Sequence, residues 1–228
     1  MRWALIAPLL DGGIESVLEV GVGQGALGYR LAERYRYVGL ELDEQALAVA
    51  RSRLAPGTLV HGDLDALAPE DRFDLIVATE VLEHYEDDIA ALRLWRERLV
   101  SGGSVLLSVP AFPERFGPWD VKAGHYRRYE REGLTATLRA GGFEPVTIRT
   151  YGYPLGNLLE AARDAVAKRQ ATKGSMEERT AASGRLLQPS RTTGWLTAGA
   201  GAVGGLLQRP FTGGRRGVGF VALARATG

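Results

Sequence analysis

Three carboxylates stand at the ends of short apolar segments early in the chain: Glu19, Glu41 and Asp63. Glu19 comes two residues before Gly21-Val22-Gly23-Gln24-Gly25, a turn whose glycines let the backbone bend sharply and let a ligand approach the next helix. A carboxylate at that point repels a pyrophosphate and attracts an ammonium group. Glu41 can accept hydrogen bonds from both hydroxyls of a ribose, and Asp63 can accept one from the amino group of an adenine.

These three groups match one ligand, S-adenosylmethionine, which has an amino group, a ribose and an adenine but no phosphate. The turn by itself is ambiguous, because Gly23, Gly25 and Gly28 also satisfy the GxGxxG pattern of dinucleotide-binding proteins. An NAD-type Rossmann oxidoreductase is therefore an alternative interpretation. Two features count against it: Glu19 disfavours a pyrophosphate, and 228 residues leave little room for a second catalytic domain.

A second group of reactive side chains follows further along the chain. Glu80-Val81-Leu82-Glu83-His84 comes directly after an apolar segment, and His125 stands well beyond it. If residues 80–84 begin a helical turn, Glu80, Glu83 and His84 share one face of that turn. Imidazole titrates near neutral pH, so His84 and His125 are the candidate general bases, and Glu83 is predicted to orient the base.

The elements that must position these groups follow a regular pattern. Short apolar segments alternate with helical stripes through the first two thirds of the sequence, which indicates βα units on a parallel sheet. Asp43 and Asp87 precede two of the stripes and are predicted to be helix N-caps. The predicted strands are residues 16–20, 37–42, 58–60, 73–79, 104–109, 143–151 and 218–224.

The segment between the last two predicted strands differs in composition from the rest. It begins with an amphipathic helix after Pro154, and residues 173–194 are polar, with Gly, Ser and Thr throughout. We therefore predict a ligand-binding core of residues 1–154 and 217–228, with residues 155–216 inserted as a basic lid. Within that lid, residues 170–194 are expected to be mobile and to become ordered over the acceptor.

In this order and spacing the motifs resemble those of class I S-adenosylmethionine-dependent methyltransferases over residues 16–151, and the final strand also fits. The segments similar to that family's motifs are residues 19–25, 38–41, 62–63, 73–77 and 99–106. The resemblance implies an α/β fold with a doubly wound, seven-stranded Rossmann-like sheet of order 3-2-1-4-5-7-6, its last strand antiparallel. It assigns cofactor binding to Glu19, Gly21, Gly23, Gly25, Glu41, Leu42, Asp63, Leu64 and Thr79.

Several absences narrow the reaction. Residues 73–79 are not followed by the Asn-Pro-Pro or Asp-Pro-Pro pattern of exocyclic-amine methyltransferases, and no cysteine is present for covalent attack on cytosine. With three lysines in the chain, a lysine-based ribose methylation is also disfavoured. We expect no DNA or RNA substrate, and instead in-line methyl transfer to the hydroxyl of a small-molecule acceptor with His-assisted deprotonation. The other alternative is a non-catalytic module that binds S-adenosylmethionine and has no need of His84 or His125.

The segment of residues 80–84 with a later histidine is also similar to the ubiquinone-pathway O-methyltransferases and the small-RNA 3′-end 2′-O-methyltransferases. In those enzymes the pattern holds a divalent cation. The resemblance implies a metal site of Glu80, Glu83, His84 and His125, whose oxygen and nitrogen ligands suit Mg²⁺, Mn²⁺ or Zn²⁺. The same segment is common in small-molecule methyltransferases without a metal. We favour the metal-free interpretation, because it requires fewer residues to converge.

Charge is distributed unevenly along the chain. Residues 1–154 carry 17 basic and 23 acidic side chains, whereas residues 155–217 carry 10 basic and 4 acidic ones. The basic segment either faces an anionic acceptor or forms a solvated surface. Acceptor binding is assigned to Tyr126, Arg127 and Arg128. The alternatives are that Tyr126 is a packing aromatic, like the nearby Tyr129, and that the two arginines pair with the acidic core.

Nothing in the sequence indicates export. There is no cysteine for a disulfide, and the first ten residues lead into Asp11-Gly12-Gly13 rather than into the cleavage site of a signal peptide. The longest weakly apolar stretch, residues 195–207, is too short to cross a bilayer. We expect a cytoplasmic protein without a membrane span.

Overall fold

Seven strands form one mixed sheet in the computed structural model, which describes residues 2–10, 12–55, 57–169, 175, 179–180 and 208–227. The strands are β1 (Ser16–Val20), β2 (Arg36–Glu41), β3 (Leu59–His61), β4 (Phe73–Thr79), β5 (Leu99–Pro110), β6 (Phe143–Tyr151) and β7 (Gly219–Ala226). Their order is β3-β2-β1-β4-β5-β7-β6, and β7 is antiparallel to both of its neighbours. The predicted fold, including the strand order and the antiparallel last strand, is confirmed.

The strand boundaries follow the predicted ones closely, with one larger difference. β1, β4 and β6 begin and end at the predicted residues, and β2, β3 and β7 are displaced by one or two residues. β5 begins at Leu99, five residues before the predicted start, because Leu99 pairs with Phe73 ahead of an irregularity in the ladder. Gly102, with φ of +71°, lies in that irregularity, and regular pairing resumes where Ser104 meets Leu75.

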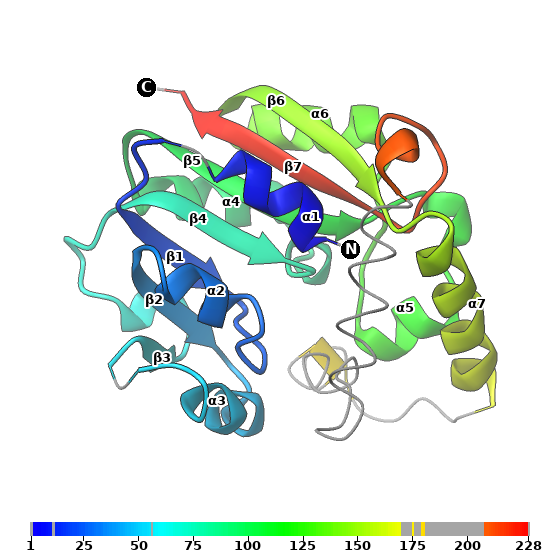
Figure 1. Ribbon diagram of the computed structural model, residues 1–228, viewed down its shortest axis with the longest axis horizontal. Helices are drawn as coiled ribbons and strands as arrows, with labels where there is room; N and C mark the ends of the chain where they lie inside the picture. Colours follow the sequence, from blue (N-terminus) through cyan, green and yellow to red (C-terminus); the bar gives the residue numbers. More distant parts are fainter. Residues whose placement is uncertain are drawn as a thin grey trace.

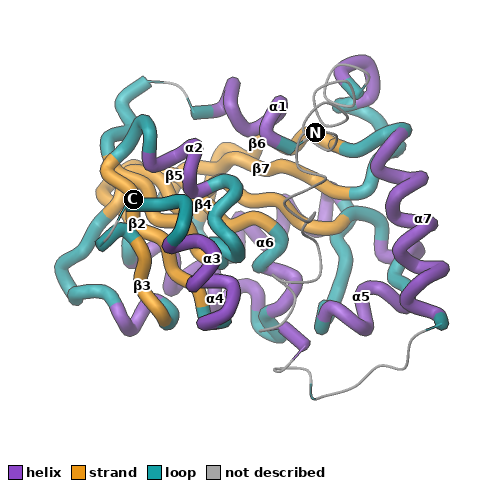
Figure 2. Tube along the Cα trace, turned by 60° about the horizontal axis from the view of Figure 1, so that its bottom comes forward, coloured by secondary structure: helices purple, strands orange, loops and turns teal. Residues whose placement is uncertain are grey.

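Helices cover both faces of the sheet (Figure 2). The α-helices among the described residues are α1 (Trp3–Ile6), α2 (Gly28–Ala32), α3 (Glu44–Arg51), α4 (Asp88–Glu97), α5 (Pro118–Ala123), α6 (Arg131–Ala140) and α7 (Leu155–Lys168). The 3₁₀ helices are η1 (Ala7–Leu9), η2 (Leu64–Ala66), η3 (Leu82–His84), η4 (Pro113–Arg115) and η5 (Arg209–Phe211). α4 and α6 pack on one face and α1 and α2 on the other, so the central strands are buried on both sides.

Alternating residues of β4 divide the core into two halves. Ile76 and Ala78 face Trp95 of α4 in one apolar cluster, whereas Leu75 and Val77 face Ile6 of α1 in the other. The two predicted N-caps are confirmed: the Asp43 carboxylate accepts a hydrogen bond from the Gln45 N–H, and the Asp87 carboxylate accepts one from the Ala90 N–H. These caps fix where α3 and α4 start after the strand ends.

α5 and α7 stand beyond the carboxyl ends of β1 and β4, apart from the helices that cover the sheet (Figure 1). α7 follows Pro154, as the amphipathic pattern predicts. The predicted mobile lid of residues 170–194 lies outside the described residues, apart from Ser175, Arg179 and Thr180. Within the described parts of the chain, no helix has the length and apolar character that a membrane span requires.

We expect the N-cap of α4 to stabilise the whole domain, because α4 carries Trp95 into the larger core cluster. Replacing Asp87 by Ala removes the acceptor for the Ala90 N–H and should lower the free energy of unfolding by about 1 kcal/mol. Urea unfolding monitored by circular dichroism measures this change. Glu97→Ala, at the exposed opposite end of α4, is the control, and equal stability of the two variants would contradict the assigned role.

Candidate functional site

A cavity of about 1210 Å³ opens at the carboxyl ends of the parallel strands. One part of its wall consists of predicted cofactor residues: Glu19, Gly21, Gly23, Glu41, Leu42, Asp63 and Thr79. Gly25 and Leu64, also predicted, do not line it. The opposite part of the wall comes from α5, α7, the end of η3 with His84 and the loop that carries His125. The structure therefore brings the predicted cofactor carboxylates and Glu80, His84 and His125 to one cavity, whereas Glu83 is fully buried and does not line it.

The glycines of the turn let neighbouring side chains approach the backbone more closely than a larger residue would allow. Gly21 has φ of +74°, and a Cβ atom there would lie 2.6 Å from Cγ2 of Val81. Gly25 has φ of +81°, and a Cβ atom there would press on Ala50 and Leu54 at 3.2 Å, so its part is to let the turn pack on α3. The turn thus lies close to the Glu80–His84 segment without blocking the cavity.

Glu41 ties the glycine-rich turn to the end of β2. Its Oε2 accepts a hydrogen bond from the Gly23 N–H at 2.6 Å, and its Oε1 accepts one from the Asp43 N–H at 2.9 Å. Each carboxylate oxygen can accept a second hydrogen bond. Because Glu41 also lines the cavity, its remaining lone pairs are available to a ligand with vicinal hydroxyls, such as a ribose.

Glu19 is buried at the end of β1, where the Tyr37 hydroxyl donates a 2.6 Å hydrogen bond to its Oε2. Burial raises the pKa of Glu19 to about 8, although the bond from Tyr37 acts in the opposite direction. A Cβ atom on Gly28 would collide with the Tyr37 hydroxyl, so the glycine lets α2 approach this pair. A cationic ligand group beside Glu19 would stabilise the carboxylate and displace its proton.

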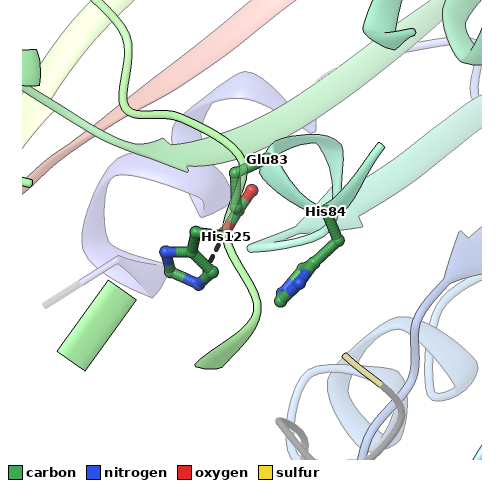
Figure 3. Close-up of side chains that lie close together, drawn as sticks. All are labelled: Glu83, His84 and His125. Atoms are coloured by element: carbon green, nitrogen blue, oxygen red, sulfur yellow. Dashed lines mark ion pairs between the residues drawn. The ribbon is translucent and has the colours of Figure 1, made fainter. Parts of the chain in front are cut away.

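Glu83, His84 and His125 form a cluster whose candidate ligand atoms all lie within 4.8 Å of one another. Figure 3 shows the two imidazoles on either side of Glu83. Nδ1 of His84 lies 3.1 Å from the Gly124 carbonyl oxygen. Since a carbonyl only accepts, Nδ1 carries the hydrogen and Nε2 keeps a free lone pair. Burial lowers the pKa of His84 to about 4, so the ring is neutral near pH 7.

Asp120, which the sequence analysis missed, holds His125 in place. Its Oδ1 lies 2.9 Å from Nδ1 of His125, which leaves Nε2 of that ring turned to the cluster. Arg128 donates to both oxygens of Asp120 and, through Nη1, to Glu160 of α7 at 2.5 Å. Burial raises the pKa of Asp120, but hydrogen bonds from His125 and Arg128 outweigh it and lower the pKa to about 2.

Glu83 has a different environment. Both of its oxygens are buried and have no hydrogen-bond partner among the described residues, and Oε1 lies 3.8 Å from Nε2 of His125. Burial, with the negative charge of Glu80, raises the pKa of Glu83 well above its ordinary value. The carboxyl group therefore holds a proton, unless a cation compensates its charge. The contact that orients His125 comes from Asp120 rather than from Glu83.

Glu80 does not join the helical turn that the sequence predicts. η3 begins at Leu82, and Glu80 has φ of +58° in the left-handed region. Three contacts hold it there: the Ser108 hydroxyl donates to it at 3.0 Å, the Tyr151 hydroxyl donates at 2.9 Å, and Arg2 pairs with it at 3.3 Å. The expectation of one shared face for Glu80, Glu83 and His84 is therefore wrong, and the cluster contains the latter two with His125.

The three predicted acceptor residues have different environments. Tyr126 is 39% exposed and, like Arg127, does not line the cavity. Arg127 pairs with Asp88 at 3.0 Å, which agrees with the alternative prediction that this arginine pairs with the acidic core and does not bind the acceptor. Arg128 lines the cavity, but Asp120 and Glu160 already occupy its guanidinium. Tyr129 is buried and donates to Asp88, which is a packing role.

Several cavity residues gave no signal in the sequence. Trp119, Glu160 and Arg163 come from α5 and α7, and Arg2 and Trp3 come from the N-terminal residues. Each lies in, or directly before, a helix whose position depends on long-range packing, so no local motif marks it. The amphipathic pattern predicted α7 itself, and the excess of basic residues after residue 154 pointed toward this segment, but neither feature marked Glu160 or Arg163.

Comparisons with known proteins agree with this geometry. Residues 17–103 match the family model described as a methyltransferase domain. A protein of Mycobacterium tuberculosis named as an uncharacterized methyltransferase is 34% identical over 123 residues, which are 52% of this chain and 62% of that protein. A ubiquinone biosynthesis O-methyltransferase of Nitrosospira multiformis is 35% identical over 101 residues, covering 41% of this chain and 42% of the relative. This chain thus matches less than two thirds of the length of either relative.

A solved structure of an S-adenosylmethionine-dependent methyltransferase from Archaeoglobus fulgidus superposes with a TM-score of 0.59 at 15% identity. The match covers 98% of this chain and 91% of that one. In its matched domain, its motif order and its seven-stranded sheet, the chain is similar to the class I S-adenosylmethionine-dependent methyltransferases. The residues described above fit S-adenosylmethionine, because the glycine-rich turn and the carboxylates of Glu19 and Glu41 line one cavity.

Replacing Glu41 by Ala should weaken binding of S-adenosylhomocysteine, because two ribose hydroxyls lose their acceptor and the glycine-rich turn loses its anchor. The loss should be on the order of 1 to 3 kcal/mol in binding free energy. Isothermal titration calorimetry measures it, with Glu44→Ala as a control, since that nearby carboxylate does not line the cavity. Unchanged affinity in the Glu41 variant would refute the assignment.

Binding of S-adenosylhomocysteine at pH 7 should release a proton from Glu19. The raised pKa, about 8, means that the empty protein mostly holds this proton below pH 8, and an adjacent ammonium group favours the ionised form. Titrations in buffers of different ionisation enthalpy should give a release that approaches one proton and disappears above pH 9. Glu19→Gln should abolish the release. An equal release in that variant would place its source elsewhere.

Proposed function

We propose that the protein transfers a methyl group from S-adenosylmethionine to a hydroxyl group of a small-molecule acceptor. The observation that carries this proposal is the pair of imidazoles, His84 and His125, which line the same cavity as Glu19 and Glu41. Both rings have Nδ1 engaged in a hydrogen bond, so each presents Nε2 as an acceptor. Such groups suit the removal of a proton from an acceptor hydroxyl.

When bound, S-adenosylmethionine supplies an electrophilic methyl group. The chain's own part is to align the acceptor, exclude water and take up the proton. His125 accepts that proton at Nε2, and the ionised Asp120 carboxylate at Nδ1 stabilises the resulting imidazolium. His84 remains neutral near pH 7 and can orient the hydroxyl through its Nε2. The relation to a ubiquinone biosynthesis O-methyltransferase supports a hydroxyl as the acceptor group.

A divalent cation is the second candidate for the same step, and the environment of Glu83 favours it. The two oxygens of Glu83 are buried without a partner among the described residues, next to the free Nε2 atoms of two histidines. A cation held by Glu83, His84 and His125 would compensate the buried carboxylate and lower the pKa of a bound hydroxyl. In the metal-free form, a proton on Glu83 compensates the same charge.

The two versions give different results on chelation. If His125 is the base without a metal, treatment with EDTA should leave methyl transfer unchanged, and His125→Ala should lower kcat by roughly 100-fold while cofactor affinity is kept. If the cluster holds a cation, EDTA should abolish activity, and Mn²⁺ or Zn²⁺ should restore it. Transfer from radiolabelled S-adenosylmethionine to a panel of phenolic and aliphatic hydroxyl compounds gives the readout, and metal analysis of the purified protein accompanies it.

His61→Ala provides the matched control, because this third histidine is exposed and does not line the cavity. Full activity in both His84→Ala and His125→Ala would refute both versions and leave alignment of the acceptor as the source of catalysis. Binding of S-adenosylhomocysteine without turnover of any acceptor in the panel would favour the alternative of a non-catalytic binding module.

A further inference from the structure

Arg163 of α7 stacks on Trp119 of α5 in the cavity wall. The guanidinium carbon lies 5.4 Å from the centre of the Trp119 ring, and both residues line the cavity. Trp119 is itself fixed to α7, because its backbone N–H donates to Asp164 at 3.3 Å. The ring and the helix therefore hold the guanidinium in one position, which reduces the side-chain freedom that a ligand would otherwise have to restrict.

The charge of this guanidinium is not compensated by the described residues. No carboxylate among them forms an ion pair with Arg163, and its buried Nε has no hydrogen-bond partner there. Two other arginines of the cavity wall differ: Arg128 is bound by Asp120 and Glu160, and Arg2 pairs with Glu80. A third, Arg30, is exposed to solvent and lies over the Trp3 ring. An arginine is charged at all ordinary pH values, so an unpaired buried donor on it calls for an acceptor, preferably an anionic one.

Arg163 also stands at a defined place relative to the proposed base. Glu160 lies one helical turn earlier on α7 and holds Arg128, which holds Asp120, which in turn holds His125. Leu159 and Val166, on the same helix, add apolar surface to the cavity beside Arg163. α7 thus places the Arg163 guanidinium next to apolar side chains in the cavity wall. It lies one helical turn from Glu160, which is hydrogen-bonded through Arg128 and Asp120 to His125.

We propose that Arg163 and Trp119 form a subsite for an anionic group of the acceptor, a carboxylate or a phosphate monoester, remote from the hydroxyl that is methylated. The proposal rests on the proposed function in that it names the class of acceptor for the same cavity. A planar guanidinium presents paired N–H donors that match the oxygens of either anion. Arg127, by contrast, is paired with Asp88 and lies outside the cavity.

The test uses three probes that share a phenyl ring: benzoate, phenyl phosphate and the neutral benzamide. Their affinities are measured by ligand-detected NMR with the full chain, both with and without S-adenosylhomocysteine. At least one of the two anions should bind about 10-fold or more tightly than benzamide. Preference for benzoate alone or phenyl phosphate alone identifies which anion the subsite takes.

Variants connect this preference to Arg163. Arg163→Gln should reduce the preference by roughly 10- to 100-fold, and Arg163→Lys should retain part of it, since it keeps the charge but loses the planar fork. Arg169→Gln is the matched control, because it removes the same charge from an exposed position just after α7 that does not line the cavity. Thermal unfolding of each variant verifies that it is folded. If Arg163→Gln does not fold, a reduced preference for the anion in Arg163→Lys is the result that supports the role of Arg163.

Equal binding of anions and benzamide, or an undiminished preference in the Arg163 variants, would overturn the proposal. Its failure is distinct from failure of the proposed function. S-adenosylhomocysteine binding is measured separately on the same samples, and the titrations without it report on Arg163 whether or not the cofactor binds.

Discussion

The Asp120 carboxylate is a buried negative charge on which the acceptor side of the cavity depends. Three groups donate to it: Nδ1 of His125, the guanidinium of Arg128 and the N–H of Gly117. Removing one partner of a buried ion pair typically costs about 3 to 5 kcal/mol, because the remaining charge is left uncompensated. Asp120 therefore fixes the tautomer of His125 and joins its loop through Arg128 to Glu160 of α7. Without it, the base would lose its orientation, and Arg128 would keep Glu160 of α7 as its one carboxylate partner among the described residues.

Two other buried carboxyl groups, Glu19 and Glu83, have different partners, although burial has the same effect on both. Glu19 keeps a donor, the Tyr37 hydroxyl, and faces the region where a cofactor ammonium would lie. Glu83 has no donor among the described residues and faces two imidazoles instead. Burial raises the pKa of both groups. A nearby positive charge would therefore displace the proton from either carboxyl group. At Glu19 that charge would be an ammonium group, and at Glu83 it would be a metal ion.

The strands and the carboxylates at their ends could be predicted from the sequence, because local patterns determine them. Side-chain conformations that depend on contacts between distant residues could not be predicted. Strands such as β4 are marked by short apolar runs between turns, and the carboxylates at their ends fall at the same edge of a parallel sheet. The conformation of Glu80 is set by Arg2, Ser108 and Tyr151, which are distant in sequence, so a helical reading of residues 80–84 could not foresee it. Asp120 and Arg163 likewise look like ordinary helix residues until α5 and α7 pack together.

The two helices beyond the sheet give the cavity a link between acceptor binding and the position of the base. Glu160 and Arg163 lie one turn apart on α7, the first holding the Arg128–Asp120–His125 network and the second holding the proposed anionic group. Any displacement of α7 that moves Arg163 also moves Glu160, because a helix transmits motion as a rigid unit over one turn. Recognition of an anion by Arg163 and orientation of His125 through Glu160 would therefore depend on the same turn of one helix.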